Sequence, residues 1–139
     1  MNGNFEDLFK LCDIENGWKD LYKNYSLNEI VDESKFLSLI KETHEYFIPT
    51  CEEKSISKTM IDILLSIHAF STDKVYISNE CETYKLIANG LLQAIICDIH
   101  IERYKKGEFD VEINNKIICF DVNKPNIKNI LKEVSKVKS

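Results

Sequence analysis

Hydrophobic and polar residues alternate between residues 95 and 122, and this alternation predicts strands with one buried face. From residue 95 to residue 102 the odd positions are apolar, and the polar positions between them are Asp98, His100 and Glu102. The pattern resumes from residue 108 to residue 113, where the polar positions are Glu108, Asp110 and Glu112. A third stretch at residues 117–120 completes a predicted three-stranded antiparallel meander.

The loop at residues 105–107 sets the register between the first two predicted strands. It ends in Gly107, which favours a three-residue turn closed in the left-handed region. The resulting pairs are Glu102 with Asp110 and His100 with Glu112. Residues opposite each other share a face of the sheet, so this register collects the acidic side chains on one side.

The second turn predicts a tight hairpin. Residues 114 and 115 are both Asn, which tolerates the positive φ of a type I′ turn. The resulting pairs are Val111 with Ile118 and Phe109 with Phe120. The apolar face formed in this way has to be covered, and helices elsewhere in the chain supply the expected cover.

Apolar spacing near 3.6 residues predicts helices before the meander, at about residues 4–12, 18–25, 34–47, 55–69 and 79–90. Gly17 is expected to interrupt the first two, and Pro49 to end the third. Residues 89–90 are expected to end the fifth, with a continuation to Gln93 as the alternative. The fourth is apolar nearly all round, so it is the expected central core helix. Residues 75–77 are a candidate fourth strand.

The tail predicts a closing amphipathic helix that begins at Pro125. Its apolar side is Ile127, Ile130, Leu131 and Val134, and its lysines form the solvated side. The whole pattern predicts one α+β domain over residues 1–139. In it, a helical N-terminal half packs on a C-terminal three- to four-stranded antiparallel meander with a closing C-terminal helix.

Composition narrows the classes of function. The 139 residues carry a formal net charge of −5, and the body is more acidic still because lysines cluster after residue 123. An acidic body repels phosphate backbones and attracts basic proteins, so we expect a basic protein partner and no direct nucleic-acid binding. The absence of a long apolar run and of a signal-peptide pattern predicts a cytoplasmic protein without a membrane span.

The sequence carries no motif for catalysis. Its five cysteines are scattered without a CxxC pair, which predicts reduced, mostly buried thiols. P-loop, GxGxxG and GxSxG motifs do not occur in it. We therefore expect neither a cofactor nor an enzymatic activity.

The acidic face of the meander is the candidate site. Glu102 opposite Asp110 is a like-charge pair, which destabilises a sheet unless something offsets the repulsion. One interpretation is a docking surface for a basic protein, formed by Asp98, His100, Glu102, Glu108, Asp110 and Glu112. Another is the divalent metal site of a metal-dependent hydrolase, with the ligands Asp98, His100, Glu102 and Asp110. An ordinary hydrated sheet face is the third.

Self-association is a further alternative. Ile117 and Cys119 interrupt the polar face of the third predicted strand, which indicates that this face is partly covered. With the aromatic residues of the N-terminal helices, they would form the interface of a small structural or regulatory oligomer.

In its size, its charge and its acidic strands at residues 98–102 and 108–112, the chain resembles the immunity proteins of bacterial toxin systems, such as those of contact-dependent growth inhibition. The resemblance implies a stoichiometric inhibitor that covers the active site of a basic, nuclease-type toxin. Its carboxylates would pair with lysines and arginines of that site, with His100 as a pH-sensitive contact.

Overall fold

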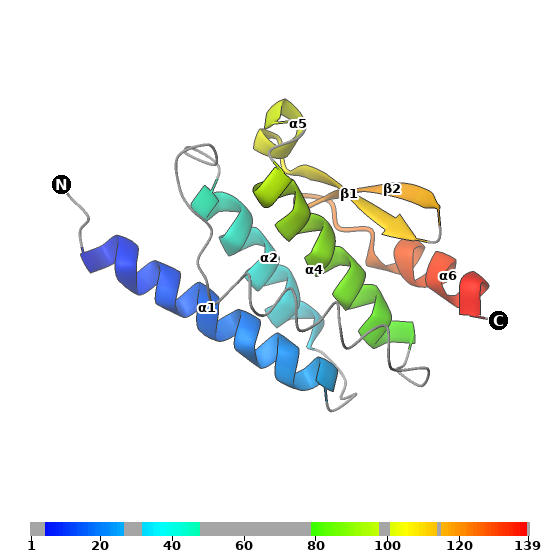
Figure 1. Ribbon diagram of the computed structural model, residues 1–139, viewed down its shortest axis with the longest axis horizontal. Helices are drawn as coiled ribbons and strands as arrows, with labels where there is room; N and C mark the ends of the chain where they lie inside the picture. Colours follow the sequence, from blue (N-terminus) through cyan, green and yellow to red (C-terminus); the bar gives the residue numbers. More distant parts are fainter. Residues whose placement is uncertain (1–4, 27–31, 48–78, 98–100, 114, 139) are drawn as a thin grey trace.

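The computed structural model describes residues 5–26, 32–47, 79–97, 101–113 and 115–138 (Figure 1). In chain order they form α1 (Phe5–Ser26), α2 (Glu33–Phe47), α4 (Asn79–Cys97), α5 (Ile101–Lys105), β1 (Glu108–Ile113), β2 (Lys116–Asp121) and α6 (Ile127–Lys138). The described chain is therefore mostly helical, with a two-stranded antiparallel sheet before its last helix. The predicted helical N-terminal half and closing C-terminal helix are confirmed.

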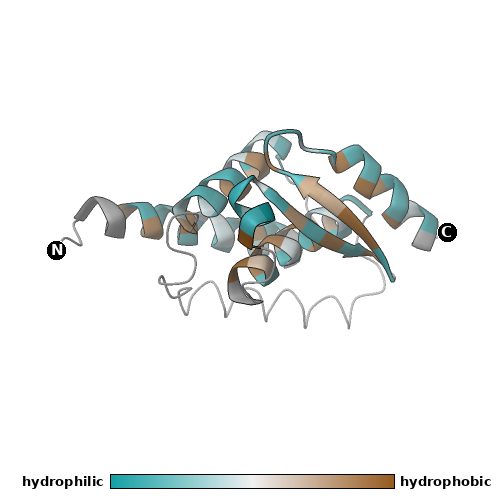
Figure 2. Cartoon of the chain, turned by 90° about the horizontal axis from the view of Figure 1, so that it is seen from above, coloured by the Kyte–Doolittle hydropathy of each residue, from teal (hydrophilic) through white to brown (hydrophobic). Residues whose placement is uncertain are grey.

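The helices α1, α2 and α4 lie side by side in that order (Figure 1). On its other side α4 packs against β1, and α6 also packs against α4. As a result α1 and α6 lie at opposite ends of the molecule (Figure 1 and Figure 2). The buried core is continuous through these elements and includes Trp18, Phe47, Leu91 and Phe120.

Helices α1 and α2 approach each other closely at Gly17. A Cβ atom at this position would lie 2.7 Å from Leu39 Cδ1. The neighbouring Trp18 is fully buried, and its Nε1 donates a hydrogen bond of 3.0 Å to Thr43 Oγ1 on α2. The predicted interruption at Gly17 is wrong, because a glycine costs a helix only about 1 kcal/mol and the packing against α2 offsets that cost.

The helix α4 is longer than predicted because Gly90 serves packing and does not end the helix. A Cβ atom on Gly90 would lie 2.6 Å from the backbone oxygen of Asp110 and 3.2 Å from the ring of Phe109. Glycine thus lets the backbone of α4 touch β1 directly. The helix continues to Cys97, so the predicted end at residues 89–90 is wrong.

The hairpin of β1 and β2 has the predicted register. Phe109 pairs with Phe120 and Val111 with Ile118. Asn115 has a φ of 71°, which is the positive value that the predicted turn requires. A one-residue slip would turn the apolar side chains to the outer face, because side chains alternate between the two faces of a strand. The turn residues favour the same register as this alternation, so the register is well specified.

The predicted first strand is wrong, because residues 95–97 belong to α4 and residues 101–105 form α5. The apolar spacing upstream explains the difference. Buried residues recur at the helical period and carry the helix into the alternating stretch: Ala88, Leu91, Leu92 and Ile95. The described residues thus contain two strands in place of three or four. The predicted core helix at residues 55–69 and the candidate strand at residues 75–77 lie outside the described residues.

The closing helix α6 begins at Ile127, two residues after the predicted Pro125. The carbonyl oxygen of Asn126 accepts the first helical hydrogen bonds, so Asn126 is the N-cap. The apolar side is buried at Ile127, Ile130 and Val134, as predicted. Figure 2 shows hydrophilic and hydrophobic residues side by side along this helix, which is typical of an amphipathic helix on a surface.

Candidate protein-binding surface

The outer face of the hairpin is the surface formed by six side chains: Glu108, Asp110 and Glu112 of β1 and Ile117, Cys119 and Asp121 of β2. Successive side chains of a strand point to opposite sides, so these six lie opposite the buried Phe109, Val111 and Phe120. The register places Glu108 beside Asp121, Asp110 beside Cys119, and Glu112 beside Ile117. The face therefore combines four carboxylates with one apolar side chain and one thiol.

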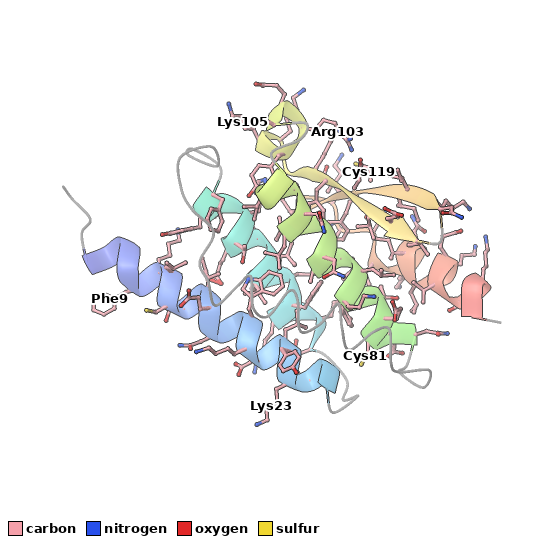
Figure 3. All side chains as sticks on the ribbon, in the orientation of Figure 1. Phe9, Lys23, Cys81, Arg103, Lys105 and Cys119 are labelled. Carbon is pink, nitrogen blue, oxygen red and sulfur yellow. The ribbon has the colours of Figure 1, made fainter. Side chains whose placement is uncertain are left out.

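Arg103 of α5 reaches over one end of this face. Its Nη2 and Nη1 donate hydrogen bonds of 2.8 and 3.4 Å to the two carboxylate oxygens of Asp110. Its Nε lies 3.6 Å from Glu108 Oε1, and Nη2 also donates to Cys119 Sγ at 3.3 Å. The bond to Asp110, followed by that to Cys119, raises the pKa of Arg103 further above its usual range. Figure 3 shows Arg103 directed toward Cys119, while Lys105 points away.

The two ends of the outer face differ in their charge pairing. At the α5 end, Glu108 and Asp110 share the guanidinium. At the turn end, Glu112 is exposed and has no ion-pair partner among the described residues. Its cross-strand neighbour Ile117 is 65% exposed. The turn end thus offers a carboxylate beside an apolar side chain, which suits a basic side chain with an aliphatic stem.

Three of the six predicted contact residues lie together on β1: Glu108, Asp110 and Glu112. Glu102 does not belong to the sheet. It lies on α5 with its side chain 87% exposed and its Oε1 atom 3.9 Å from Lys105 Nζ. The predicted pair of Glu102 with Asp110 is wrong, because α5 is a helix and Cys119 lies opposite Asp110.

Asp98 and His100 lie outside the described residues, together with the predicted pair of His100 and Glu112. Sequence reasoning missed Arg103, although a signal was present. Arg103 is the only arginine of the chain, and it stands five residues before the first carboxylate of β1. An arginine close to alternating carboxylates is a reasonable indicator of a bidentate pair.

Two of the three cysteines whose side chains the structure describes are more exposed than predicted. Cys12 and Cys119 are exposed and Cys81 is buried. The expectation that the outer side of β2 is partly covered is also wrong, since both Ile117 and Cys119 are exposed there. Arg103 contacts this part of β2 through its hydrogen bond to Cys119 Sγ, and Cys119 remains exposed.

Tyr104 fixes the helix from which Arg103 extends. The buried Tyr104 hydroxyl donates a hydrogen bond of 2.9 Å to the backbone oxygen of His44 on α2. In return, His44 Nε2 donates to the backbone oxygen of Tyr104. Since a carbonyl oxygen only accepts, neutral His44 carries its proton on Nε2. Burial lowers the pKa of His44 from its ordinary value, and the bond to Tyr104 opposes this shift only in part.

An open groove of about 320 Å³ lies between β2 and α6. Its lining residues are Lys116, Ile117 and Ile118 of β2 and Asn129, Lys132, Glu133 and Lys136 of α6. Glu133 accepts hydrogen bonds from Lys116 Nζ at 2.8 Å and from Lys136 Nζ at 3.0 Å. These two bonds, that of Lys116 first, lower the pKa of Glu133. Ile117 belongs both to the outer face and to this groove.

The described residues show no metal centre: no three His, Cys, Asp or Glu side chains among them are placed to share a cation. Of the four predicted metal ligands, Glu102 and Asp110 lie on different elements, and Asp98 and His100 are outside the described residues. The carboxylates of the outer face can form ion pairs and hydrogen bonds with cationic groups, and the exposed Ile117 offers an apolar contact beside them.

Comparison with protein-family models, with curated proteins and with solved structures finds no significant match to this chain. Within the described ranges, no helix combines the length and the apolar character needed to cross a membrane.

Proposed function

We propose that this protein is a stoichiometric inhibitor of the immunity-protein kind, which binds a basic, nuclease-type toxin in the cytoplasm and covers its active site. The observation that supports this proposal is the outer face of the hairpin, where four carboxylates gather and only two of them, Glu108 and Asp110, share the guanidinium of Arg103. Such a surface attracts a cationic protein and repels nucleic acid.

The turn end of the outer face is the proposed first contact. A lysine or arginine of the partner would pair with Glu112 and lay its aliphatic stem along Ile117. Complementary charge at this position would speed association, and the apolar contact would slow dissociation. Both effects are available here because the two side chains are cross-strand neighbours and exposed.

The α5 end would contribute carboxylates that are already oriented. Arg103 holds Asp110 in a bidentate pair, so this carboxylate has little rotamer freedom left to lose on binding. Glu108 and Glu102 would extend the acidic surface toward α5. Asp98 and His100 complete the proposed contact set, with His100 as a contact that responds to pH.

The proposed mechanism is occlusion, and the protein is not proposed to catalyse a reaction. A nuclease holds the phosphates of its substrate with lysines and arginines. If the carboxylates of the outer face occupy those cations, inhibitor and nucleic acid compete for one surface. Tight binding then depends on a few well-placed contacts between these carboxylates and the cations of the partner more than on the net charge of the chain.

The test is affinity capture of the tagged protein from its native host, with quantitative mass spectrometry at low and moderate salt. The wild type should retain one basic protein in equimolar amount, and less of it as salt rises. Glu112→Lys should retain about tenfold less, because it sets like charges against each other. Glu42→Lys makes the same charge change at an exposed position of α2 and is the matched control.

Two results would contradict the proposal in different ways. Equal retention by Glu112→Lys and the wild type would show that the partner does not use the outer face. Failure to retain any basic protein at low salt would contradict the inhibitory function itself.

A further inference from the structure

Two rows of opposite charge lie on the described surface. The acidic row is Glu108, Asp110 and Glu112 on β1, and the lysine row is Lys128, Lys132 and Lys136 on α6. Lysines four residues apart share one side of a helix and are about 6 Å apart along its axis. Carboxylates two residues apart on a strand are about 6.7 Å apart. The rows therefore match in number and nearly match in spacing.

The ion pairs that the two rows make lie close to each row. Glu108 and Asp110 of the acidic row pair with Arg103, and in the described part of the chain no ion pair joins Glu112 to Lys128 or Lys132. Lys136 is bonded to Glu133 of its own helix. β2 lies between the rows, because it pairs with β1 on one side and borders the groove with α6 on the other.

Ile117 lies between the acidic row and the lysine row. It is the cross-strand neighbour of Glu112, and it lines the groove that contains Lys132 and Lys136. With 65% of its surface exposed, it is one of two large hydrophobic side chains that the described chain leaves exposed, the other being Phe9 on α1. In Figure 3 Phe9 projects from α1, far from the hairpin.

We propose that a second copy of the chain docks on this surface about a two-fold axis near Ile117. The order acidic row, Ile117, lysine row is self-complementary, because a two-fold rotation places the lysine row of each copy against the acidic row of the other. It also brings the two Ile117 side chains together and removes their apolar surface from water. The complementary charge and spacing belong to this chain alone and do not require the proposed toxin partner.

One consequence connects the dimer with the outer face. The second copy covers the acidic row, so a basic partner has to displace it. Free inhibitor would then be a dimer, and the inhibitory complex would contain one copy of the chain.

The first test is sedimentation velocity of the purified protein at high micromolar concentration, in low and in high salt. A dimer that dissociates as salt rises is the expected result, because the exposed charge pairs are screened. A strict monomer in low salt would overturn the proposal, and so would a dimer that salt leaves unchanged.

The second test exchanges charges between the rows. Glu112→Lys and Lys132→Glu should each weaken self-association by about tenfold or more, because each sets like charges against each other twice in a symmetric dimer. An equimolar mixture of the two variants should associate again, since both contacts then pair Lys with Glu. Glu42→Lys and Lys19→Glu, at exposed positions of α2 and α1, are the matched controls.

Recovery in the mixture distinguishes the interface from loss of folding, because an unfolded variant would not be rescued by another. If neither single variant weakens the dimer, or if the mixture remains monomeric, the proposed interface is wrong. Both tests use the purified protein alone, so their failure leaves the proposed function to be judged by its own experiment.

Discussion

His44 and Tyr104 each donate a side-chain hydrogen bond to the backbone carbonyl oxygen of the other. Their rings lie 4.5 Å apart between centroids, and both residues are buried. This reciprocal contact joins α2 to α5, two elements separated by about sixty residues in the chain. It also fixes the start of the Arg103 side chain, so the geometry of the outer face depends on a contact inside the core.

The first prediction concerns the pH dependence of folding. Burial lowers the pKa of His44 in the folded state below its ordinary value of 6.5. The unfolded chain therefore takes up a proton first as the pH falls. The stability that neutral His44 contributes is complete above about pH 6.5. As the pH falls from there toward the lowered pKa of the folded state, this stability is lost. The free energy of unfolding then decreases by no more than about 1.4 kcal/mol per pH unit.

The measurement is chemical denaturation of the wild type and His44→Gln at about pH 7.5 and about pH 5.5. The amide of Gln can still donate to Tyr104 but does not titrate. The wild type should lose more stability between these values than the variant does. An equal loss in both proteins would show that His44 does not carry the pH dependence.

The second prediction concerns two glycines that allow close packing. Gly90→Ala should destabilise the protein by roughly 2 kcal/mol or more, because its Cβ would meet the backbone oxygen of Asp110 at 2.6 Å. Gly17→Ala should cost less, since its Cβ would meet the end of the flexible Leu39 side chain and alanine favours the helix. Thermal or urea denaturation compares the two, and a larger loss for Gly17→Ala would contradict this account.

The third prediction concerns the pair of Arg103 and Asp110. Both side chains are more than one-third exposed, so water screens their attraction. A double-mutant cycle with Arg103→Met and Asp110→Asn should give a coupling energy of about 0.2–1 kcal/mol. The bidentate geometry places the value toward the upper end. A coupling of several kcal/mol would mean that the pair supports the fold itself.

The fourth prediction concerns the thiols. Cys12 and Cys119 are exposed and should react rapidly with an alkylating reagent in the native state, whereas buried Cys81 should react only after unfolding. Peptide mapping by mass spectrometry at short reaction times measures each site separately, and a denatured sample gives the full labelling. Equal rates at Cys81 and Cys119 would contradict the described burial.

The hairpin could be predicted from the sequence because its determinants are local. Two Asn residues define the turn, and the alternation on each side allows only one register that buries Phe109 and Val111. The stretch at residues 95–102 could not be assigned in this way. Its alternation is too short to outweigh the helical spacing of Leu91, Leu92 and Ile95 just before it.

The candidate site, like the fold, could be predicted from the sequence only where local patterns determine it. The carboxylates of β1 follow from the alternation within one strand. The position of Arg103 does not, because it depends on the contact of Tyr104 with His44 and hence on a tertiary contact that no local pattern contains. The prediction that Glu102 lies on a strand was wrong for the same reason, since Glu102 lies on α5 and the contact of Tyr104 with His44 positions that helix.

Gly90 contacts the backbone of β1, so the position of the hairpin on α4 does not depend on the side chains of its outer face. Main-chain atoms and inward side chains of β1 pack against α4, and the outward side chains of β1 take no part in that contact. Substitutions at the outward positions can therefore accumulate without disturbing the packing of β1 on α4. A descendant of this chain could acquire a different partner by changing a few outward residues, while inheriting the same hairpin on the same helix.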